Sequence, residues 1–236
     1  MAIKAVLFDL DGTLLPMDQN EFLKGYFGLL TKKMVASGYD AATFMKALLT
    51  GTDAMVVNDG TKTNEAVFWQ EFGKFYTPET LPSMTLFDEF YAQDFPKTAA
   101  FCSYDARPRA IVDLVKSKGL VTVLATAPAF PAIATETRMG YVGLKPTDFS
   151  LYTTYENCTY CKPNPNYYRE VLGRIGYAPE KCLMVGNDVT DDMIPAREVG
   201  MQVFLLTHYI INKIDADISV YPHGGYDELI AYIEKL

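Results

Sequence analysis

The chain opens on an apolar run that ends in two carboxylates: Ala2-Ile3-Lys4-Ala5-Val6-Leu7-Phe8-Asp9-Leu10-Asp11-Gly12-Thr13. Residues 3–8 are mostly apolar or β-branched, which predicts a short buried strand. A buried strand does not hold unpaired charges, so we expect Asp9 and Asp11 where the strand leaves the core, at its carboxyl end. In open parallel α/β sheets this edge is where ligands bind.

The spacing of the two acids has a chemical use. Residues two apart on an extended chain point the same way, so the carboxylates of Asp9 and Asp11 would lie side by side. Such charges repel unless a divalent cation or a shared proton relieves them. With a hard cation such as Mg²⁺, one carboxylate can attack while the other handles a proton. An Asp-rich turn closed by Gly12, without any chemistry, is the alternative that this stretch alone leaves open.

Composition bounds the class of protein. The 236 residues allow one large domain or two modest ones, and 49% hydrophobic with 21% charged residues is typical of globular chains. The net charge of −8 argues against nucleic acid and anionic membrane as partners, although a local cation still lets a phosphorylated substrate bind. The sequence has no run as long as a membrane span or a signal peptide, so we expect a cytoplasmic protein. The four cysteines fit a reducing compartment.

The periodicity changes along the chain. Helical spacing in residues 16–96 predicts helices at 21–35, 41–49, 64–76 and 78–95, with Gly51 just past the end of the second. The many aromatic residues there are expected to form a helical core rather than a ligand cage. Strands and helices then alternate, which predicts a parallel sheet with right-handed crossovers. The predicted fold class is α/β, with a Rossmann-like core of residues 1–15 and 97–236 and an inserted all-helical cap of residues 16–96.

Two later strand ends carry polar groups suited to a phosphate. Thr126 follows a strand at 120–125, and its hydroxyl together with the N–H of Ala127 could bind a phosphate oxygen, although a Thr that caps a turn would look the same. Lys162 precedes a proline-braced loop that leads into a helix. There it could neutralise a carboxylate and a transferring phosphoryl group, or it could simply be an exposed lysine.

An acidic stretch follows the predicted strand at 182–185. Four residues bring Asp188 and Asp192 to neighbouring positions on a helical turn, and crowded carboxylates are costly without a cation. Asp191 and Asp192 could instead be acids at a helix N-terminus that complement its dipole.

These four stretches, each after a predicted strand, together resemble the motifs of the haloacid dehalogenase-like (HAD) superfamily of phosphohydrolases. Residues 9–13 are similar to the first motif, Thr126 to the second, residues 162–165 to the third and residues 187–192 to the fourth. The helical insertion is similar to the C1-type cap of phosphoglycolate phosphatase and β-phosphoglucomutase. The fourth motif departs from the common pattern, because Asn187 stands where many members have Asp and Asp188 occupies an adjacent slot that variants use.

The resemblance implies a Mg²⁺-dependent phosphatase that hydrolyses a small phosphorylated metabolite through an aspartyl-phosphate. Asp9 would be the nucleophile, and Asp11 would be the general acid and base. The phosphoryl group would be bound by Gly12, Thr13, Thr126, Ala127 and Lys162. The metal would be held by Asp9, the backbone carbonyl of Asp11, and Asp188, with Asn187 assisting and Asp192 either near the metal or orienting Lys162.

Two other functions stay open. A basic residue at the entrance to the cap would help a sugar-phosphate phosphomutase. Residues 14–23 contain no Lys, Arg or His, so such a residue is not evident there. A non-catalytic binding or regulatory module would have no reason to keep the crowded carboxylates.

We expect a monomer or weak homodimer. Cys158 and Cys161 form a C-x-x-C without a second pair at zinc spacing, so a metal or redox role is not expected for them. The two histidines, His208 and His223, lack a motif, so structural or surface roles are expected.

Overall fold

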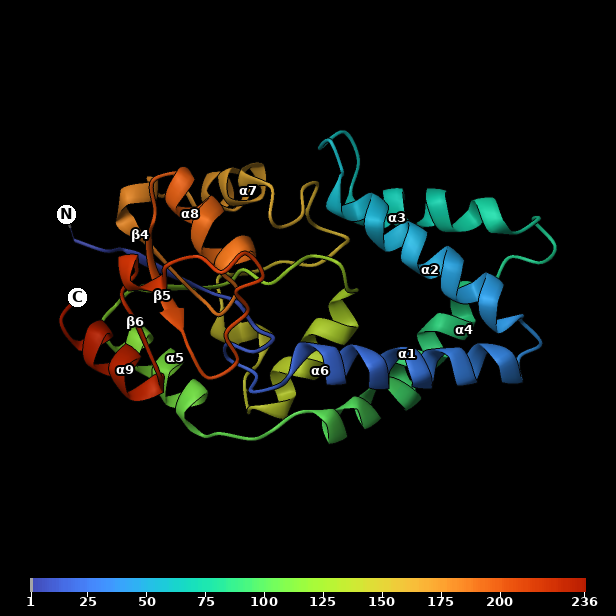
Figure 1. Cartoon of the computed structure of the whole chain (residues 1–236), viewed down its shortest axis with the longest axis horizontal. Coiled ribbons are helices and arrows are strands. Elements are labelled where there is room, and N and C mark those ends of the chain that lie inside the picture. Colours follow the sequence, from blue (N-terminus) through green and yellow to red (C-terminus); the bar gives the residue numbers. More distant parts are fainter. Residues whose placement is uncertain (1) are drawn as a thin grey trace.

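A six-stranded parallel sheet forms the centre of the computed structural model, which describes residues 2–236 (Figure 1). The strand order is β3-β2-β1-β4-β5-β6, so β1 lies inside the sheet between β2 and β4. The predicted α/β class is therefore confirmed. The strands are β1 (Ala5–Phe8), β2 (Val121–Leu124), β3 (Leu151–Tyr152), β4 (Cys182–Gly186), β5 (Gln202–Leu206) and β6 (His223–Gly224).

The register of the sheet brings three strand ends together. Phe8 at the end of β1 pairs with Leu124 of β2 and with Val185 of β4. The ladder continues one residue further, since the N–H of Asp9 donates to the Val185 carbonyl over 2.9 Å. The residues that follow these three strands consequently leave the sheet side by side.

Helices cover both faces of the sheet. Alternate residues of β1 point to opposite faces, with Val6 and Phe8 in one hydrophobic cluster and Ala5 and Leu7 in the other. The first cluster packs under α5, α6 and α9, and the second under α7 and α8 (Figure 1). These helices are α5 (Arg107–Ser117), α6 (Ala132–Tyr141), α7 (Pro165–Ile175), α8 (Ile194–Glu198) and α9 (Tyr226–Glu234).

Between β1 and β2, residues 19–101 form only helices, and this helical layer extends to one side of the sheet (Figure 1). Four of its helices begin at an N-cap whose side chain accepts backbone N–H bonds: Asp18, Asp40, Thr63 and Ser83. The elements are α1 (Gln19–Ala36), α2 (Ala41–Val56), α3 (Asn64–Phe72), α4 (Met84–Glu89), a π-helical turn (Phe90–Asp94) and 3₁₀ segments at Gly73–Phe75 and Phe95–Phe101.

Two of the predicted helices have wrong boundaries. Helix α2 does not end before Gly51 but continues to Val56, because this glycine serves packing rather than termination. A Cβ on Gly51 would lie 2.7 Å from Cδ2 of Phe68, so its absence lets α2 and α3 approach closely. The predicted helix at 78–95 starts only at Met84, after the Ser83 cap, and helical geometry continues to Phe101.

The helical layer begins and ends at neighbouring points. The N–H of Ser103 donates to the carbonyl of Pro16 over 2.7 Å, which joins the segment entering the layer to the segment leaving it. Both connections therefore lie beside the turn that follows β1. Across residues 2–236, every helix is too short or too polar to cross a bilayer.

Candidate active site

Lys162 lies at the centre of a carboxylate cluster at the carboxyl edge of the sheet. Its Nζ is 3.0 Å from Oδ1 of Asp9 and 2.6 Å from Oδ1 of Asp192. All three residues are buried. Burial disfavours the charged lysine, but the carboxylates of Asp192 and Asp9 outweigh it and raise the pKa of Lys162 well above its usual value. A fixed cation thus stands beside Asp9.

Asp192 holds this lysine in place. Its second oxygen, Oδ2, accepts the N–H groups of Asn187 and Asp188, each over 3.1 Å. A side chain on Gly186 would overlap this carboxylate, so the glycine allows Asp192 to reach the loop. Both oxygens of Asp192 are occupied, and of its two predicted roles the contact with Lys162 is the one observed.

Asp11 is paired with a residue that the sequence reasoning missed. Nη1 of Arg138 in α6 donates to Oδ2 of Asp11, and the guanidinium is fully buried with its carbon 4.3 Å from the Phe130 ring centroid. Burial raises the pKa of Asp11 and Arg138 lowers it, with a net rise. Oδ1 of Asp11 is buried without a hydrogen-bond partner in residues 2–236. Arg138 lies at a buried position of α6, and a buried charge needs a partner. An arginine at a buried position of this helix was therefore the signal that could have indicated an ion pair.

A small hollow of about 40 Å³, the inner cavity, opens among these groups. Thr126 and Ala127 line it from the end of β2, and the N–H of Ala127 makes no hydrogen bond within the described chain. The carbonyl of Thr126 accepts the hydroxyls of Thr153 and Tyr167, which fixes this strand end. The inner cavity is lined by Asp9, Asp11, Gln19, Thr126, Ala127, Lys162, Asn187, Asp188, Asp191, Asp192 and Ile211.

Gly12 and Thr13, predicted to bind phosphate, lie outside the inner cavity. Gly12 has a φ of +79° and donates its N–H to the Leu15 carbonyl over 2.8 Å. The N–H of Thr13 donates to Leu10, and its hydroxyl donates to Oδ1 of Asn187 over 3.0 Å. Because the turn uses these donors itself, neither residue presents one to a ligand.

Asn187 connects three loops. Oδ1 accepts the Thr13 hydroxyl, while Nδ2 donates to the carbonyl of Tyr209 over 2.6 Å. The amide lies directly against Gly12, where a Cβ would overlap it. Both ends of the side chain are therefore engaged in protein contacts.

Asp188 offers a free oxygen to the inner cavity. Its Oδ1 accepts the N–H groups of Thr190 and Asp191, as the N-cap of a π-helical turn (Val189–Met193). Oδ2 of Asp188 and Oδ2 of Asp9 make no hydrogen bond within residues 2–236. Mg²⁺ takes one or two carboxylates together with waters and phosphate oxygens, so this donor set fits it. Within residues 2–236, no group of three or more Asp, Glu, His or Cys side chains is arranged to hold a metal ion by itself.

A second, larger hollow of about 550 Å³, the outer cavity, adjoins the first and shares Asp11, Gln19 and Ala127 with it. It lies between the helical layer and the loops after β2 and β3. The prediction that the aromatic residues of the helical layer form its core is right for Phe44 and Phe72, which are buried. Trp69 and several other aromatic side chains of the layer line the outer cavity.

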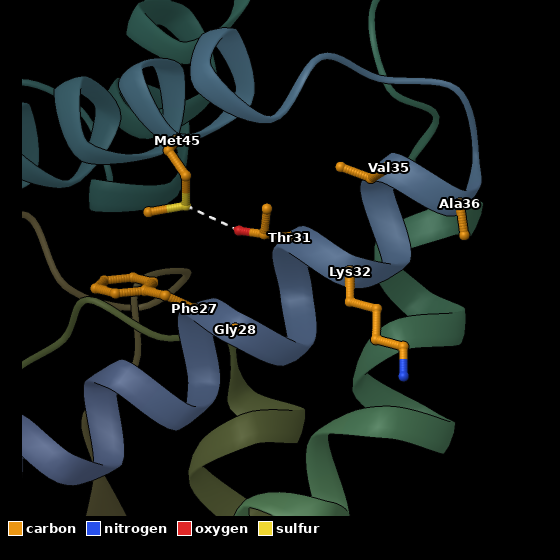
Figure 2. A pocket seen from close by; sticks show the side chains of 7 residues that line it. All are labelled: Phe27, Gly28, Thr31, Lys32, Val35, Ala36 and Met45. Carbon is orange, nitrogen blue, oxygen red and sulfur yellow. Dashed lines mark hydrogen bonds between the residues drawn. The ribbon is translucent and has the colours of Figure 1, made fainter.

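A further hollow, of about 730 Å³, lies away from these carboxylates, between α1 and α2 (Figure 2). Its lining is apolar apart from Thr31 and Lys32, and the Thr31 hydroxyl donates to Sδ of Met45 over 3.0 Å. Lys32 extends away from Met45 in this view. No carboxylate lines this hollow, whereas Asp9, Asp11, Asp188 and Asp192 line the inner cavity.

The remaining polar motifs have structural surroundings. Cys158 and Cys161 are buried free thiols, and burial raises the pKa of Cys158 to about 12. The Cys158 carbonyl accepts the N–H of Asn64 from α3 over 2.9 Å. His208 stacks on Tyr226, and His223 contacts the Tyr221 carbonyl. None of these residues lines the inner cavity.

The parallel sheet defines an α/β protein, and the acids at the carboxyl ends of its strands surround a candidate ligand site. Comparison with known families makes the class specific. A model described as "Hydrolase: haloacid dehalogenase-like hydrolase" matches residues 3–200. The chain belongs to this hydrolase family, and the resemblance found in its motifs is confirmed.

The individual relatives share either a low sequence identity with this chain or a higher identity over a short segment. A glyceraldehyde 3-phosphate phosphatase from Methanothermobacter thermautotrophicus is 34% identical over 58 residues, which are 25% of this chain and 26% of that protein. A HAD phosphatase from Thermococcus onnurineus has a TM-score of 0.61 and 19% identity, with 98% of both chains covered. A predicted phosphoglycolate phosphatase from Haemophilus somnus has a TM-score of 0.59 and 17% identity, covering 98% of this chain and 97% of that chain. These two structures share the fold.

Proposed function

We propose that this hydrolase is a Mg²⁺-dependent phosphatase that cleaves a small phosphorylated metabolite through an aspartyl-phosphate on Asp9. The observation that carries the proposal is the position of Lys162, which contacts both Asp9 and Asp192 in the cavity that Asp11 and Thr126 also line. A nucleophile, a proton carrier and a fixed cation around one small space are what phosphoryl transfer requires.

In the first step Asp9 attacks phosphorus. The bond from its carboxylate oxygen to phosphorus forms, and the bond from phosphorus to the ester oxygen breaks. Lys162 faces the charge on the transferring oxygens, and the Thr126 hydroxyl and Ala127 N–H are placed to donate to them. Asp11 gives its proton to the departing alkoxide, which leaves as an alcohol.

In the second step Asp11 takes a proton from water. The water oxygen bonds to phosphorus, the bond to Asp9 breaks, and inorganic phosphate leaves. Arg138 holds one Asp11 oxygen, so the other is directed away from that ion pair.

Mg²⁺ would be held by Asp9, the backbone carbonyl of Asp11, and Asp188. When bound it supplies positive charge to the phosphoryl oxygens and relieves the repulsion among the acids. Asn187 and Asp192 would act through their neighbours, since their hydrogen bonds go to Thr13, Tyr209, Lys162 and the loop backbone.

The domain organisation belongs to the same proposal. Residues 1–15 and 97–236 would be the catalytic core, and residues 16–96 a helical cap that covers the leaving group. The names of the phosphatase relatives support a phosphate ester as the substrate. We keep a cytoplasmic location and a monomer or weak homodimer as predictions. A phosphomutase is less well supported, because no basic residue of the helical layer lines either cavity in the described chain.

Turnover of p-nitrophenyl phosphate with Mg²⁺ tests the proposal. Wild type should release nitrophenol, and Asp9→Asn should lose at least about 10³-fold in kcat because the nucleophile is gone. Asp53→Asn, at an exposed acid on α2, is the matched control and should keep its rate. No turnover by wild type, or full turnover by Asp9→Asn, would rule out this mechanism.

A further inference from the structure

The outer cavity is placed to receive the leaving group. It meets the inner cavity at Asp11, the residue that protonates the ester oxygen in the proposed function. A phosphoryl group beside Asp9 and Lys162 would therefore direct the rest of its ester into this space. Its volume of about 550 Å³ lies within the range of cavities that hold whole small molecules.

Aromatic rings form much of the outer cavity. They come from the helical layer and from the loops after β2 and β3, and include Tyr26, Phe68, Trp69, Phe130 and Tyr155. Leucine and methionine side chains add to this apolar wall. A polar sugar or a short carboxylic acid would leave these rings poorly covered, whereas a flat apolar body would bury them.

The charges of the outer cavity are of one sign. Glu65, Asp88 and Glu156 line it, and no Lys, Arg or His does so within residues 2–236. In that part of the chain none of the three acids has a basic nitrogen within 4.0 Å. Arg138 lies behind Phe130, but Asp11 already neutralises it.

Glu65 and Glu156 come from neighbouring segments, since the N–H of Glu65 donates to the carbonyl of Tyr155 over 2.8 Å. Glu65 belongs to the first turn of α3, while Glu156 belongs to the loop after β3 and accepts the N–H of Ala132 over 2.9 Å. Both acids line the outer cavity, and burial and the charge of Glu156 raise the pKa of Glu65. A cation between them would relieve this repulsion, and the surrounding rings would also attract it.

We propose that the substrate is a phosphate monoester whose leaving alcohol has an aromatic or similarly flat apolar body and carries an organic cation. The inference rests on the proposed phosphatase function and names its substrate class. A carboxylate or a second phosphate on the leaving group would meet Glu65, Asp88 and Glu156 without any compensating charge, so such esters are poor substrates.

A matched series of esters tests the substrate class. Three 2-phenylethyl phosphates, with a methyl, an aminomethyl or a carboxylate group in the para position, share one reacting centre and differ only in remote charge. With Mg²⁺ present, kcat/KM should be about tenfold higher for the aminomethyl ester than for the methyl ester and about tenfold lower for the carboxylate. Equal values, or a preference for the carboxylate, would overturn the inference.

Binding of the dephosphorylated alcohols gives a readout independent of catalysis. Trp69 is the single tryptophan of the chain, it lines the outer cavity, and its Nε1–H is buried without an acceptor in residues 2–236. Its fluorescence should therefore respond to an occupant, with the aminomethyl alcohol binding tightest. If no ester is turned over but this ranking holds, the phosphatase proposal fails and the charge selectivity of the cavity stands. If esters are turned over without the ranking, the substrate inference fails.

Variants of the acids identify the source of the selectivity. Glu65→Gln and Glu156→Gln should each reduce the ratio of kcat/KM for the aminomethyl ester to kcat/KM for the carboxylate ester several-fold. Asp88→Asn gives the same test at an exposed residue of α4 that lines the cavity. Glu79→Gln is the control, because Glu79 is an exposed acid outside the cavity. An undiminished preference in all three cavity variants would contradict the proposal.

Discussion

Arg138 is a buried residue that can affect the proposed reaction through its contact with Asp11. It pairs with Asp11 on one side and lies against Phe130 on the other, with Nε donating to the Ala134 carbonyl over 3.3 Å. An arginine tied at these points holds the carboxylate of Asp11 in one orientation. Its proposed role is to position the general acid, since it lines neither cavity.

Removal of this charge should affect stability and rate separately. Arg138→Gln leaves Asp11 partly buried without its cation, so the free energy of unfolding should fall by about 3 kcal/mol and kcat should fall as well. Addition of Asp11→Asn should restore much of the stability, because the unpaired charge is then gone, but no activity. Urea unfolding and p-nitrophenyl phosphate turnover of the two single variants and the double variant measure both effects. Additive stability losses would mean that the pair is not coupled.

The fourth acidic motif has Asn187 where many members of the family have Asp, and the contacts of Asn187 give a reason for this departure. Asn187 accepts from Thr13 and donates to Tyr209, and an aspartate could not make both contacts. The motif pattern could locate Asp9, Thr126, Lys162 and Asp192, since each follows a strand. It could not show that the N–H groups of Gly12 and Thr13 donate to carbonyls within the turn, because hydrogen-bond partners depend on the folded loop.

At the scale of elements, Gly51 fixes how closely two helices pack. Gly→Ala within a helix normally stabilises by about 1 kcal/mol. Gly51→Ala should instead destabilise, because the new methyl group would meet Phe68. Gly28→Ala in α1 is the matched control, with open space around its Cβ, and should stabilise. Thermal unfolding of both variants should give Tm shifts of opposite sign, and shifts of the same sign would contradict this packing.

Asp148 fastens α5 to the segment before β3. Its carboxylate pairs with Arg109 and Lys116 and also accepts the N–H of Lys145. Burial alone would raise the pKa of Asp148, but the hydrogen bonds from Arg109 and Lys116 outweigh it and lower the pKa to about 2. Because the folded pKa lies below the unfolded one, the stabilisation is complete above about pH 4 and is lost as the pH falls towards 2.

Asp148→Asn should therefore cost up to about 2 kcal/mol at neutral pH, and the cost should shrink below pH 4. Urea unfolding of wild type and variant between pH 7 and about pH 2.5 would show the two curves converging. A difference that stays constant across this range would mean that the ion pairs contribute nothing measurable.

Local patterns predicted most elements because their causes are local. Strands β1, β2 and β4 lie at the apolar runs predicted to form them, at residues 3–8, 120–125 and 182–185. Strand β6 was missed because His223 and Gly224 carry no apolar signal and gain their strand geometry only from pairing with β5. The end of α2 was misplaced because the role of Gly51 depends on a neighbouring helix.

At the scale of the whole molecule, the helical layer is fastened to the core at the N-terminus of α3. Nδ2 of Asn64 donates to the carbonyls of Pro128 and Tyr160, and its backbone N–H donates to Cys158. Asn58 supports this contact by donating to Oδ1 of Asn64 over 2.8 Å. The C-x-x-C loop thus serves as a docking surface for the layer, a long-range contact that no local pattern could predict.

Loss of this contact should loosen the layer while leaving the inner cavity intact. Asn64→Ala removes two side-chain hydrogen bonds across the junction, so the amide of Glu65, which donates to the Tyr155 carbonyl, should exchange faster with deuterium. KM should rise more than kcat falls, because the layer lines the outer cavity but supplies none of the carboxylates proposed to react. Unchanged exchange at the start of α3 would show that the junction does not depend on Asn64.

The central claim, a phosphoryl group carried on Asp9, can be observed directly. Asp11→Asn should slow hydrolysis of the intermediate more than its formation from p-nitrophenyl phosphate, since nitrophenol leaves without needing an acid. Acid quenching during turnover, followed by peptide mass spectrometry, should find phosphate on Asp9 in this variant and none in the Asp9→Asn variant. Phosphate on any other residue, or continued release of inorganic phosphate by Asp9→Asn, would contradict the account.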